Sequence, residues 1–224
     1  MILEKSWRYE KKYLIDKSER IYVQALIRNN KFLFKEKFKK RKVRSIYFDD
    51  LNFSSYYENI EGLSDRKKYR LRWYGDTFKE SSNAQFEFKI KCNKTNSKEI
   101  FKVNNIHFDI KDNCKTILEK TLNSINNNEL KYILKKLRPL VFVEYERIYF
   151  ESFCRNIRLT YDNKLSFRRA SNPRIKSSIF KYDVIEIKYA SYNEEKFLKY
   201  IPYFQKRATR NSKYINAIHY LSIL

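Results

Sequence analysis

The chain has 224 residues, of which 42% are hydrophobic and 17% aromatic, and 49 lysines and arginines against 26 acidic residues give it a net charge of +23. This length suits one domain with a sizeable core, and the aromatic content excludes an intrinsically disordered chain. The charge indicates a polyanionic partner, while a general abundance of lysine could supply part of it without any function.

The scarce residue types exclude several kinds of site. The only glycines are Gly62 and Gly75, so neither of the Gly-rich phosphate-binding loops can be written, and any phosphate must be bound by side chains. The only histidines are His107 and His219, which support a Ser–His–Asp or Cys–His relay poorly. Three widely separated cysteines form neither a zinc knuckle nor a disulfide framework, which indicates a reducing compartment.

The N-terminal stretch lacks the apolar segment of a signal peptide, and no window approaches the roughly 18 apolar residues of a spanning helix. We therefore expect a soluble cytoplasmic protein. Attachment to the periphery of a membrane, through the basic exterior or through a membrane-protein partner, stays open.

Taken in chain order, the pattern alternates between short strands and helices. Residues 7–15 alternate and predict a strand, and Asp16 with Glu19 predicts an N-terminal cap for a helix that ends near Arg28. Further strands are predicted, after a lysine-rich loop, at 43–50, 65–76, 85–91, 99–103, 141–150, 156–162 and 183–190. Helices are predicted at 53–60, within 105–137, and from about 193 to 224 with a break near Pro202. Neither a repeat nor a linker divides the chain, so one domain over 1–224 is expected.

Charged side chains gather on one face of most predicted strands. The strand at 65–76 places Lys68, Arg70 and Arg72 on one face, opposite Leu71 and Trp73. A single such strand would simply show its charged face to water. Because the division recurs in seven predicted strands, closure of about eight strands into a barrel is favoured, and the charged faces would line a water-filled cationic tunnel.

A linear polyanion threaded through such a tunnel would match its lining. Guanidinium groups fit phosphate oxygens in a bidentate manner, and lysines supply point charges. Carboxylates in the tunnel, such as Glu186 and Glu10, would hold Mg²⁺ or Mn²⁺ that bridges phosphate oxygens. The alternative is that these acids merely balance neighbouring lysines.

Seven stretches occur in a characteristic order: RYEKKYLI, YRLRWYG, FEFKIK, VEYERIYF, IRLTYD, VIEIKY and RNSKY. This set resembles the VTC (vacuolar transporter chaperone) polyphosphate polymerase domain of the triphosphate tunnel metalloenzyme superfamily, over about residues 7 to 218. The resemblance implies an α+β fold, an antiparallel eight-stranded β-barrel tunnel with covering helices and a C-terminal helix. It also implies a phosphotransferase, dependent on Mn²⁺ or Mg²⁺, that moves the γ-phosphate of ATP to a growing polyphosphate chain.

The resemblance also implies roles for individual residues. Phosphate-binding walls are implied at Lys12, Arg70, Arg72, Lys89, Tyr145, Arg147 and Arg158, and helix-borne phosphate ligands at Arg210, Ser212 and Lys213. Glu186 is the implied metal ligand. From the strand pattern we add Lys68 and Lys188 as substrate-binding residues and Glu10 as a second candidate metal ligand. Because phosphoryl transfer needs charge stabilisation more than covalent help, catalytic roles are assigned to Arg70, Arg72, Arg147 and Lys213.

The first strand departs from the ExExK pattern that often marks this superfamily. It carries Arg8, Glu10 and Lys12, so a cation replaces the first acid, which disfavours a plain hydrolase. The expected partners are ATP and inorganic polyphosphate. Three alternatives stay open: a tunnel triphosphatase or polyphosphatase, a non-catalytic polyphosphate-binding regulatory domain, and a nucleic-acid-binding module. The last lacks a named recognition motif and is disfavoured.

Overall fold

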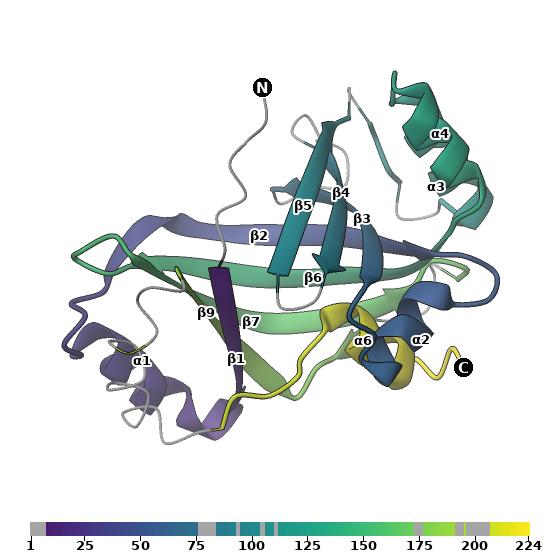
Figure 1. Cartoon of the computed structure of the whole chain (residues 1–224). Helices are drawn as coiled ribbons and strands as arrows, with labels where there is room; N and C mark the ends of the chain where they lie inside the picture. Colours follow the sequence, from purple (N-terminus) through teal and green to yellow (C-terminus); the bar gives the residue numbers. More distant parts are fainter. Residues whose placement is uncertain are drawn as a thin grey trace. The chain divides into compact units, whose positions relative to one another are not determined.

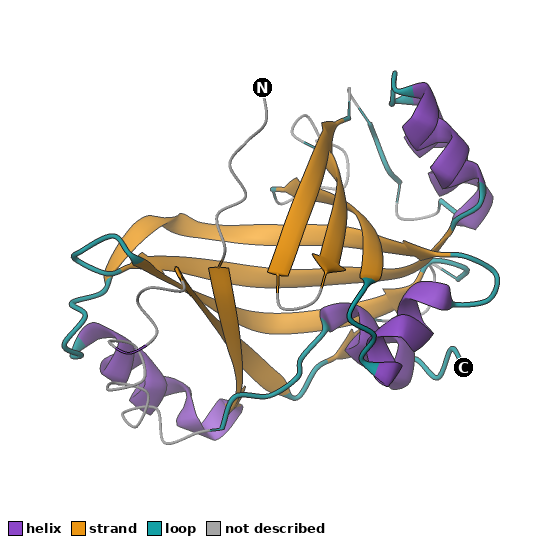
Figure 2. Cartoon of the chain, viewed as in Figure 1, coloured by secondary structure: helices purple, strands orange, loops and turns teal. Residues whose placement is uncertain are grey.

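The computed structural model describes residues 8–75, 84–92, 95–103, 106–109, 112–172, 177–190, 195 and 207–224 (Figures 1 and 2). Its strands are β1 (Arg8–Asp16), β2 (Lys35–Asp49), β3 (Arg66–Tyr74), β4 (Gln85–Cys92), β5 (Thr95–Lys102), β6 (Arg138–Glu151), β7 (Ile157–Arg169), β8 (Ser178–Ile179) and β9 (Tyr182–Ala190). Its helices are η1 (Lys17–Glu19), α1 (Arg20–Arg28), α2 (Ser54–Glu61), α3 (Cys114–Asn123), α4 (Asn128–Lys135) and α6 (Lys213–Tyr220).

All the described strands belong to one sheet of nine strands. Its order is β1-β9-β7-β6-β2-β3-β4-β5, and the two-residue strand β8 pairs with β7. The pairs β1–β9, β7–β9, β2–β3, β3–β4 and β4–β5 are all antiparallel. The predicted α+β class with an antiparallel sheet is therefore confirmed. Within the described ranges the ladder ends at β1 and β5 and does not close into a ring, and β8 makes the strand count nine instead of eight.

The chain divides into two compact units, each made of three stretches of sequence. Unit 1 comprises Met1–Arg41, Glu146–Leu165 and Phe180–Asn211, and unit 2 comprises Lys42–Tyr145, Ser166–Ile179 and Ser212–Leu224. Strands β2, β6 and β7 contribute residues to both units. The single domain expected from the sequence stays a prediction, and the units are described one at a time.

The core of unit 1 forms where α1 packs on the apolar faces of β1, β7 and β9. Val23 and Ile27 lie four residues apart on α1 and are buried with Tyr13 of β1, Leu159 of β7 and Ile187 of β9. Asp16 and Glu19 form the predicted capping box, which here opens the 3-10 turn η1 that leads into α1. The cap and the apolar spacing together place this helix at the end of β1.

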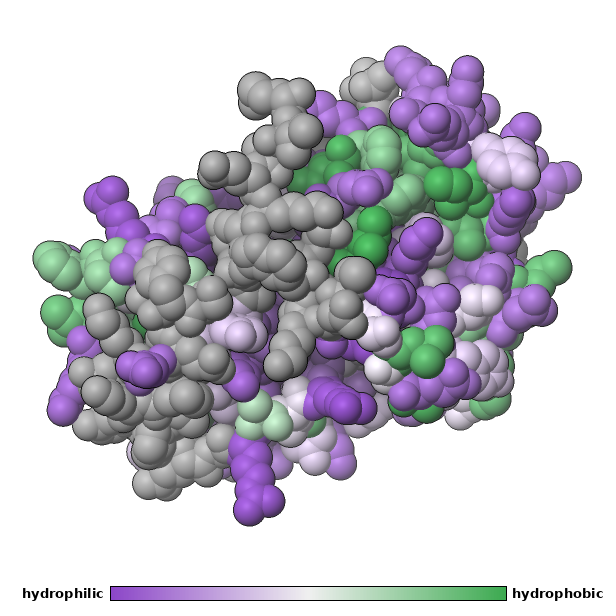
Figure 3. Space-filling view, viewed as in Figure 1, coloured by the Kyte–Doolittle hydropathy of each residue, from purple (hydrophilic) through white to green (hydrophobic). Residues whose placement is uncertain are grey.

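The core of unit 2 lies between strands β3 and β4 and helices α3 and α4 (Figure 1). Leu71 and Trp73 of β3 are fully buried there with Ile117 of α3 and Leu134 of α4. On the viewed face, hydrophobic side chains emerge between these helices and the strands β3–β5 (Figure 3). Because neighbouring side chains on a strand point to opposite faces, this packing sends Arg70 and Arg72 to the other side of β3.

Several predicted boundaries needed correction. The lysine-rich stretch expected to be a loop is the first half of β2, whose residues Lys35–Arg41 are exposed without alternation. Such a segment is held by backbone pairing and not by burial, so it carries no periodic signal. Strands β6 and β7 extend beyond 141–150 and 156–162. Within 193–224 the structure shows α6, and the break expected near Pro202 lies outside the described residues.

No helix in the described ranges is both long enough and apolar enough to cross a membrane.

Candidate functional site

Two arginines of β3, the buried Arg72 and the partly buried Arg70, lie on the charged face of unit 2. The side chains of Arg70 and Arg72 are only 17% and 7% exposed, and a buried guanidinium needs an anion or several hydrogen-bond acceptors. Glu87 of β4, the register partner of Arg70, provides the anion. Arg70 bonds to its Oε2 through Nε, and Nη1 of Arg72 lies 3.9 Å from the same oxygen. Both arginines are thereby held in place by one carboxylate.

Glu87 is completely buried and also contacts Lys98 of β5. Burial alone would raise the pKa of Glu87, but the charges of Arg70, Arg72 and Lys98 outweigh it and hold the pKa at about 2. The carboxylate is therefore ionised at neutral pH, and three cations surround one anion. Lys98 is not predicted from the sequence as a site residue, because the fifth strand is predicted at 99–103, beyond Lys98. Extending that strand to Thr95 would have included it.

Two tyrosines complete the surroundings of the arginines. Arg70 Nη1 donates to the Tyr47 hydroxyl at 3.4 Å, and Arg72 Nη2 donates to the Tyr145 hydroxyl at 3.2 Å. Burial would raise the pKa of Tyr47, yet the charges of Arg70 and Arg72 bring this pKa below its usual value. A positive potential strong enough to reverse the effect of burial on a phenol is a potential that attracts anions.

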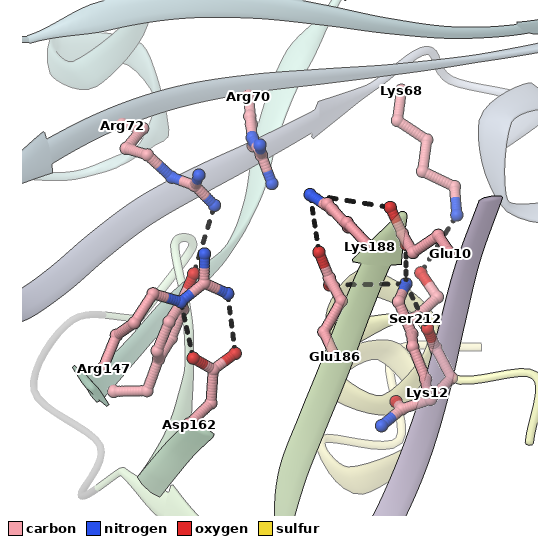
Figure 4. Close-up of polar contacts among 12 residues, drawn as sticks. Glu10, Lys12, Lys68, Arg70, Arg72, Arg147, Asp162, Glu186, Lys188 and Ser212 are labelled. Carbon is pink, nitrogen blue, oxygen red and sulfur yellow. Dashed lines mark hydrogen bonds and ion pairs between the residues drawn. The ribbon is translucent and has the colours of Figure 1, made fainter. Parts of the chain in front are cut away.

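The start of helix α6 joins this group. Lys68 Nζ donates to the Ser212 hydroxyl at 3.0 Å (Figure 4). Lys213 Nζ lies 4.7 Å from the centroid of the Tyr145 ring. We call this set the unit 2 cationic site: Tyr47, Lys68, Arg70, Arg72, Glu87, Lys98, Tyr145, Ser212 and Lys213. Six of the predicted residues thus come together. Lys89 of β4 is the register partner of Lys68 and is half-buried at the end of the same strand pair.

Unit 1 contains a second charged group, made by facing residues of β1 and β9. Glu10 pairs in register with Lys188, and Lys12 with Glu186. The ion pairs Lys188–Glu186 and Lys12–Glu10 measure 2.6 and 2.8 Å, and Lys188–Glu10 and Lys12–Glu186 measure 3.6 and 4.0 Å (Figure 4). These four residues, the unit 1 carboxylate cluster, form a ring of alternating charge. Lys12 also donates to the Asn211 carbonyl at 3.0 Å.

The donors of this cluster fit one kind of metal site. Within the described residues, no group of three or more His, Cys, Asp or Glu side chains could enclose a metal. Mg²⁺, however, is commonly held by one or two carboxylates together with substrate phosphates and water. Glu10 and Glu186, with side chains 14% and 10% exposed, offer two hard oxygen donors of this kind. Lys12 and Lys188 also balance the two acids directly, so the lysine-balancing interpretation has a structural basis as well.

The remaining predicted residues of unit 1 are three arginines that differ in ion pairing and in exposure. Arg147 of β6 binds Asp162 of β7 in a bidentate manner, at 2.6 and 2.7 Å, and Asp162 is completely buried (Figure 4). This pairing fixes the plane of the Arg147 guanidinium. Arg158 is the register partner of Lys188 but is exposed and lies 3.5 Å from Glu151. Arg210 is exposed.

Solved structures with the same fold are known from bacteria and a plant. Candidate adenylate cyclases from Vibrio parahaemolyticus and Bacillus halodurans match with a TM-score of 0.53 each, at 10% and 13% identity. The matches cover 95% and 94% of this chain, and 99% and 96% of those chains. A candidate adenylyl cyclase from Hippeastrum, reported to have a dominant triphosphatase activity, matches with a TM-score of 0.56 at 10% identity over 92% of both chains. At such low identity these likenesses show the fold alone, and they agree with the predicted tunnel type.

The family comparison covers almost the whole chain. The model of the VTC domain matches residues 7–222, which include every strand and helix described above. The match therefore spans both the unit 2 cationic site and the unit 1 carboxylate cluster. The chain belongs to the VTC domain family.

Proposed function

We propose that this protein is a polyphosphate polymerase that transfers the γ-phosphate of ATP to the end of an inorganic polyphosphate chain. The observation that carries the proposal is the unit 2 cationic site, where the buried Arg72 and the partly buried Arg70 are held in place by Glu87 before any substrate binds. Donors fixed in advance in a water-poor site stabilise developing charge more effectively than donors that must reorganise. Membership of the VTC domain family supports a polyphosphate substrate.

The residues of unit 2 have distinct proposed roles. Arg70 and Arg72 bind the oxygens of the transferred phosphoryl group, and Lys98 adds a charge beside them. Lys213, Ser212 and Lys68 hold the triphosphate or the end of the chain, with Tyr145 placing Arg72 and Lys213 next to each other. Lys89 extends the cationic wall.

The reaction balances without a covalent enzyme intermediate. An ionised terminal oxygen of polyphosphate forms a bond to the γ-phosphorus, the bond from that phosphorus to the β,γ-bridging oxygen breaks, and ADP leaves with the electron pair. The acceptor oxygen needs no general base, because it carries no proton that must be removed. What opposes the step is repulsion between two polyanions, and the arginines and lysines offset that repulsion.

In unit 1, we propose that Glu186 and Glu10 hold Mn²⁺ or Mg²⁺, which when bound would neutralise phosphate charge. Lys12, Lys188 and Arg158 are proposed to bind phosphate oxygens, and Arg147, oriented by Asp162, is proposed to add catalytic charge. Arg210 is proposed as a further phosphate ligand next to Asn211.

A triphosphatase is the second candidate, and one observation favours it. The plant protein with the same fold is reported to have a dominant triphosphatase activity. The same cations would serve that reaction, with water replacing phosphate as the acceptor.

One experiment separates the candidates. The purified protein is incubated with ATP, Mn²⁺ and a short polyphosphate primer, and chain length is read on a gel beside an assay for free phosphate. Lengthened chains with ADP, lost in Glu186→Ala but kept in Glu146→Ala, would establish the polymerase. Glu146 is a suitable control because it forms ion pairs with the exposed lysines Lys40 and Lys164. Free phosphate without chains would establish the phosphatase, and neither product would contradict both.

A further inference from the structure

Asp49, the last residue of β2, is a buried carboxylate in unit 2 that touches none of the cations of the site. It is 1% exposed. Its Oδ1 accepts from the backbone N–H groups of Asp50 at 3.0 Å and Ser55 at 2.9 Å, and its Oδ2 accepts from the N–H of Tyr56 at 3.0 Å and from the Tyr214 hydroxyl at 2.5 Å. Four donors satisfy a charge that would otherwise be costly to bury. Asp49 therefore joins the first turn of α2 to α6.

Tyr214 is the next residue in the chain after Lys213 of the unit 2 cationic site. Because Ser212 and Lys213 directly precede Tyr214, the position of Tyr214 constrains the backbone from which those two side chains extend. Its ring stacks on Tyr47, with centroids 5.6 Å apart and planes 20° apart, and Tyr47 accepts from Arg70. Burial and the nearby Asp49 charge raise the pKa of Tyr214, so the phenol keeps its proton and remains a donor.

Helix α6 depends on such a contact because it is short. It has eight residues, and its N-cap residue Ser212 makes no side-chain cap hydrogen bond. A helix of this length is marginal without tertiary packing. Ile215, Ala217 and Ile218 bury its apolar side, and at its other end Arg169 donates to the carbonyls of Leu221 and Ser222. The hydrophobic effect is non-directional, whereas a hydrogen bond to a buried carboxylate requires a defined distance and angle.

We propose that Asp49 is a positioning residue of the cationic site. By accepting the Tyr214 hydrogen bond it fixes the first turn of α6, and it thereby holds Lys213 beside Tyr145 and Ser212 beside Lys68, where both can bind a terminal phosphate. The inference rests on the proposed function, because it assigns a purpose to the position of Lys213.

The test measures binding, so that it does not depend on turnover. Inorganic tripolyphosphate with Mn²⁺ is titrated by calorimetry into the full chain, as wild type, Asp49→Asn, Lys213→Ala and the double variant. In Asp49→Asn, one carboxylate oxygen becomes an N–H₂ group that faces other donors. The hydrogen bonds that hold α6 are thereby weakened, and the affinity for tripolyphosphate is expected to fall about tenfold. If Asp49 acts through Lys213, the same change costs less than about twofold once Lys213 is alanine. Equal losses in both backgrounds would overturn the proposal.

Two further variants guard against a simple loss of folding. Tyr214→Phe keeps the stack on Tyr47 and removes only the hydroxyl, so it should weaken tripolyphosphate binding in the same direction even if Asp49→Asn does not fold. Ile117→Ala, in the core of unit 2 away from α6, lowers the melting temperature and should leave the affinity unchanged. An equal loss of affinity in Ile117→Ala would show that general destabilisation explains the effect and would refute the positioning role.

A fifth variant separates failure of this inference from failure of the proposed function. Arg72→Ala removes a proposed phosphate ligand directly. If Arg72→Ala weakens tripolyphosphate binding and both Asp49→Asn and Tyr214→Phe leave it unchanged, the positioning role is wrong and the proposed site stands. If Arg72→Ala also leaves binding unchanged, the proposed site itself is wrong, and the positioning role is wrong with it.

Discussion

Arg70 and Glu87 are register partners on β3 and β4 and form an ion pair in which the carboxylate is completely buried. An acid in a phosphate-binding site would ordinarily repel the ligand. Here it aligns Arg70 and Arg72, and Lys98 contacts it as a third cation. A phosphate bound at the proposed site could therefore contact both arginines while Glu87 stays paired with Lys98.

This pair predicts a pH dependence of stability. The pKa of Glu87 lies at about 2 in the folded protein against 4.5 for an unperturbed glutamate. Its contribution to the free energy of unfolding is therefore complete above about pH 4.5, is lost as the pH falls towards about 2, and amounts to roughly 3 kcal/mol. Urea unfolding of wild type and Glu87→Gln should show the difference between them shrinking over that range. A difference that stays constant with pH would contradict the assignment.

Removing a buried arginine should slow the reaction strongly. Arg72→Ala is expected to lower kcat/KM for phosphoryl transfer on the order of 10³-fold, by analogy with arginines that stabilise transition-state charge, and Arg72→Lys should recover part of it. Arg28→Ala is the matched control, because the Arg28 side chain is largely exposed and its ion pair with Glu36 is long, at 4.0 Å. Steady-state kinetics measure both. A loss below about tenfold for Arg72→Ala would count against the site.

The two interpretations of the unit 1 carboxylate cluster make opposite predictions for Glu186→Gln. If Glu186 holds a metal ion, the Mn²⁺ concentration for half-maximal activity should rise by about tenfold or more, since a ligating charge is lost. If Glu186 only balances Lys12 and Lys188, the Mn²⁺ requirement should stay the same. Titration of activity with Mn²⁺ after treatment with a chelator distinguishes these results, and Glu146→Gln serves as the control.

Asp183 should be critical for the stability of unit 1. It is completely buried, binds Arg20 Nε and Nη2 at 2.7 and 3.0 Å, and accepts from the Tyr161 hydroxyl at 2.5 Å. In Asp183→Asn the buried side chain loses its charge towards Arg20 and places an N–H₂ group among donors, so the free energy of unfolding should fall by about 2 kcal/mol or more. Glu36→Gln, which breaks an exposed pair, should change it by less than about 1 kcal/mol. Similar losses in the two variants would show that burial does not govern this pair.

Period-two patterning explains how much of the site could be predicted. In β3, Leu71 and Trp73 enter the core and Arg70 and Arg72 lie opposite, because alternation determines the face once one side is apolar. The same argument places Glu186 and Lys188 on one face of β9. The charge pattern thus predicted which charged side chains share a face of each strand, and their role in binding a polyanion stays a prediction.

Other features depend on contacts that a local pattern does not contain. The sequence position of Glu87 shows its face but not that it is buried beside Lys98, which belongs to a strand with little alternation. Lys35–Arg41 looks like a loop because exposure on both faces removes the periodic signal. Asp49 and Tyr214 are 165 residues apart in the sequence, and only the folded chain shows that they form a hydrogen bond.

The division of the chain has a consequence for how this protein can be dissected or can evolve. Each unit is assembled from three stretches, and the chain passes from one unit to the other after residues 41, 145, 165, 179 and 211. Three of these passages occur within β2, β6 and β7. No single cut therefore yields either unit as a continuous fragment, and neither unit can be gained, lost or exchanged as a cassette by recombination at one or two points. Exchange of a single continuous segment would therefore not transfer one complete unit with its charged group and leave the other intact.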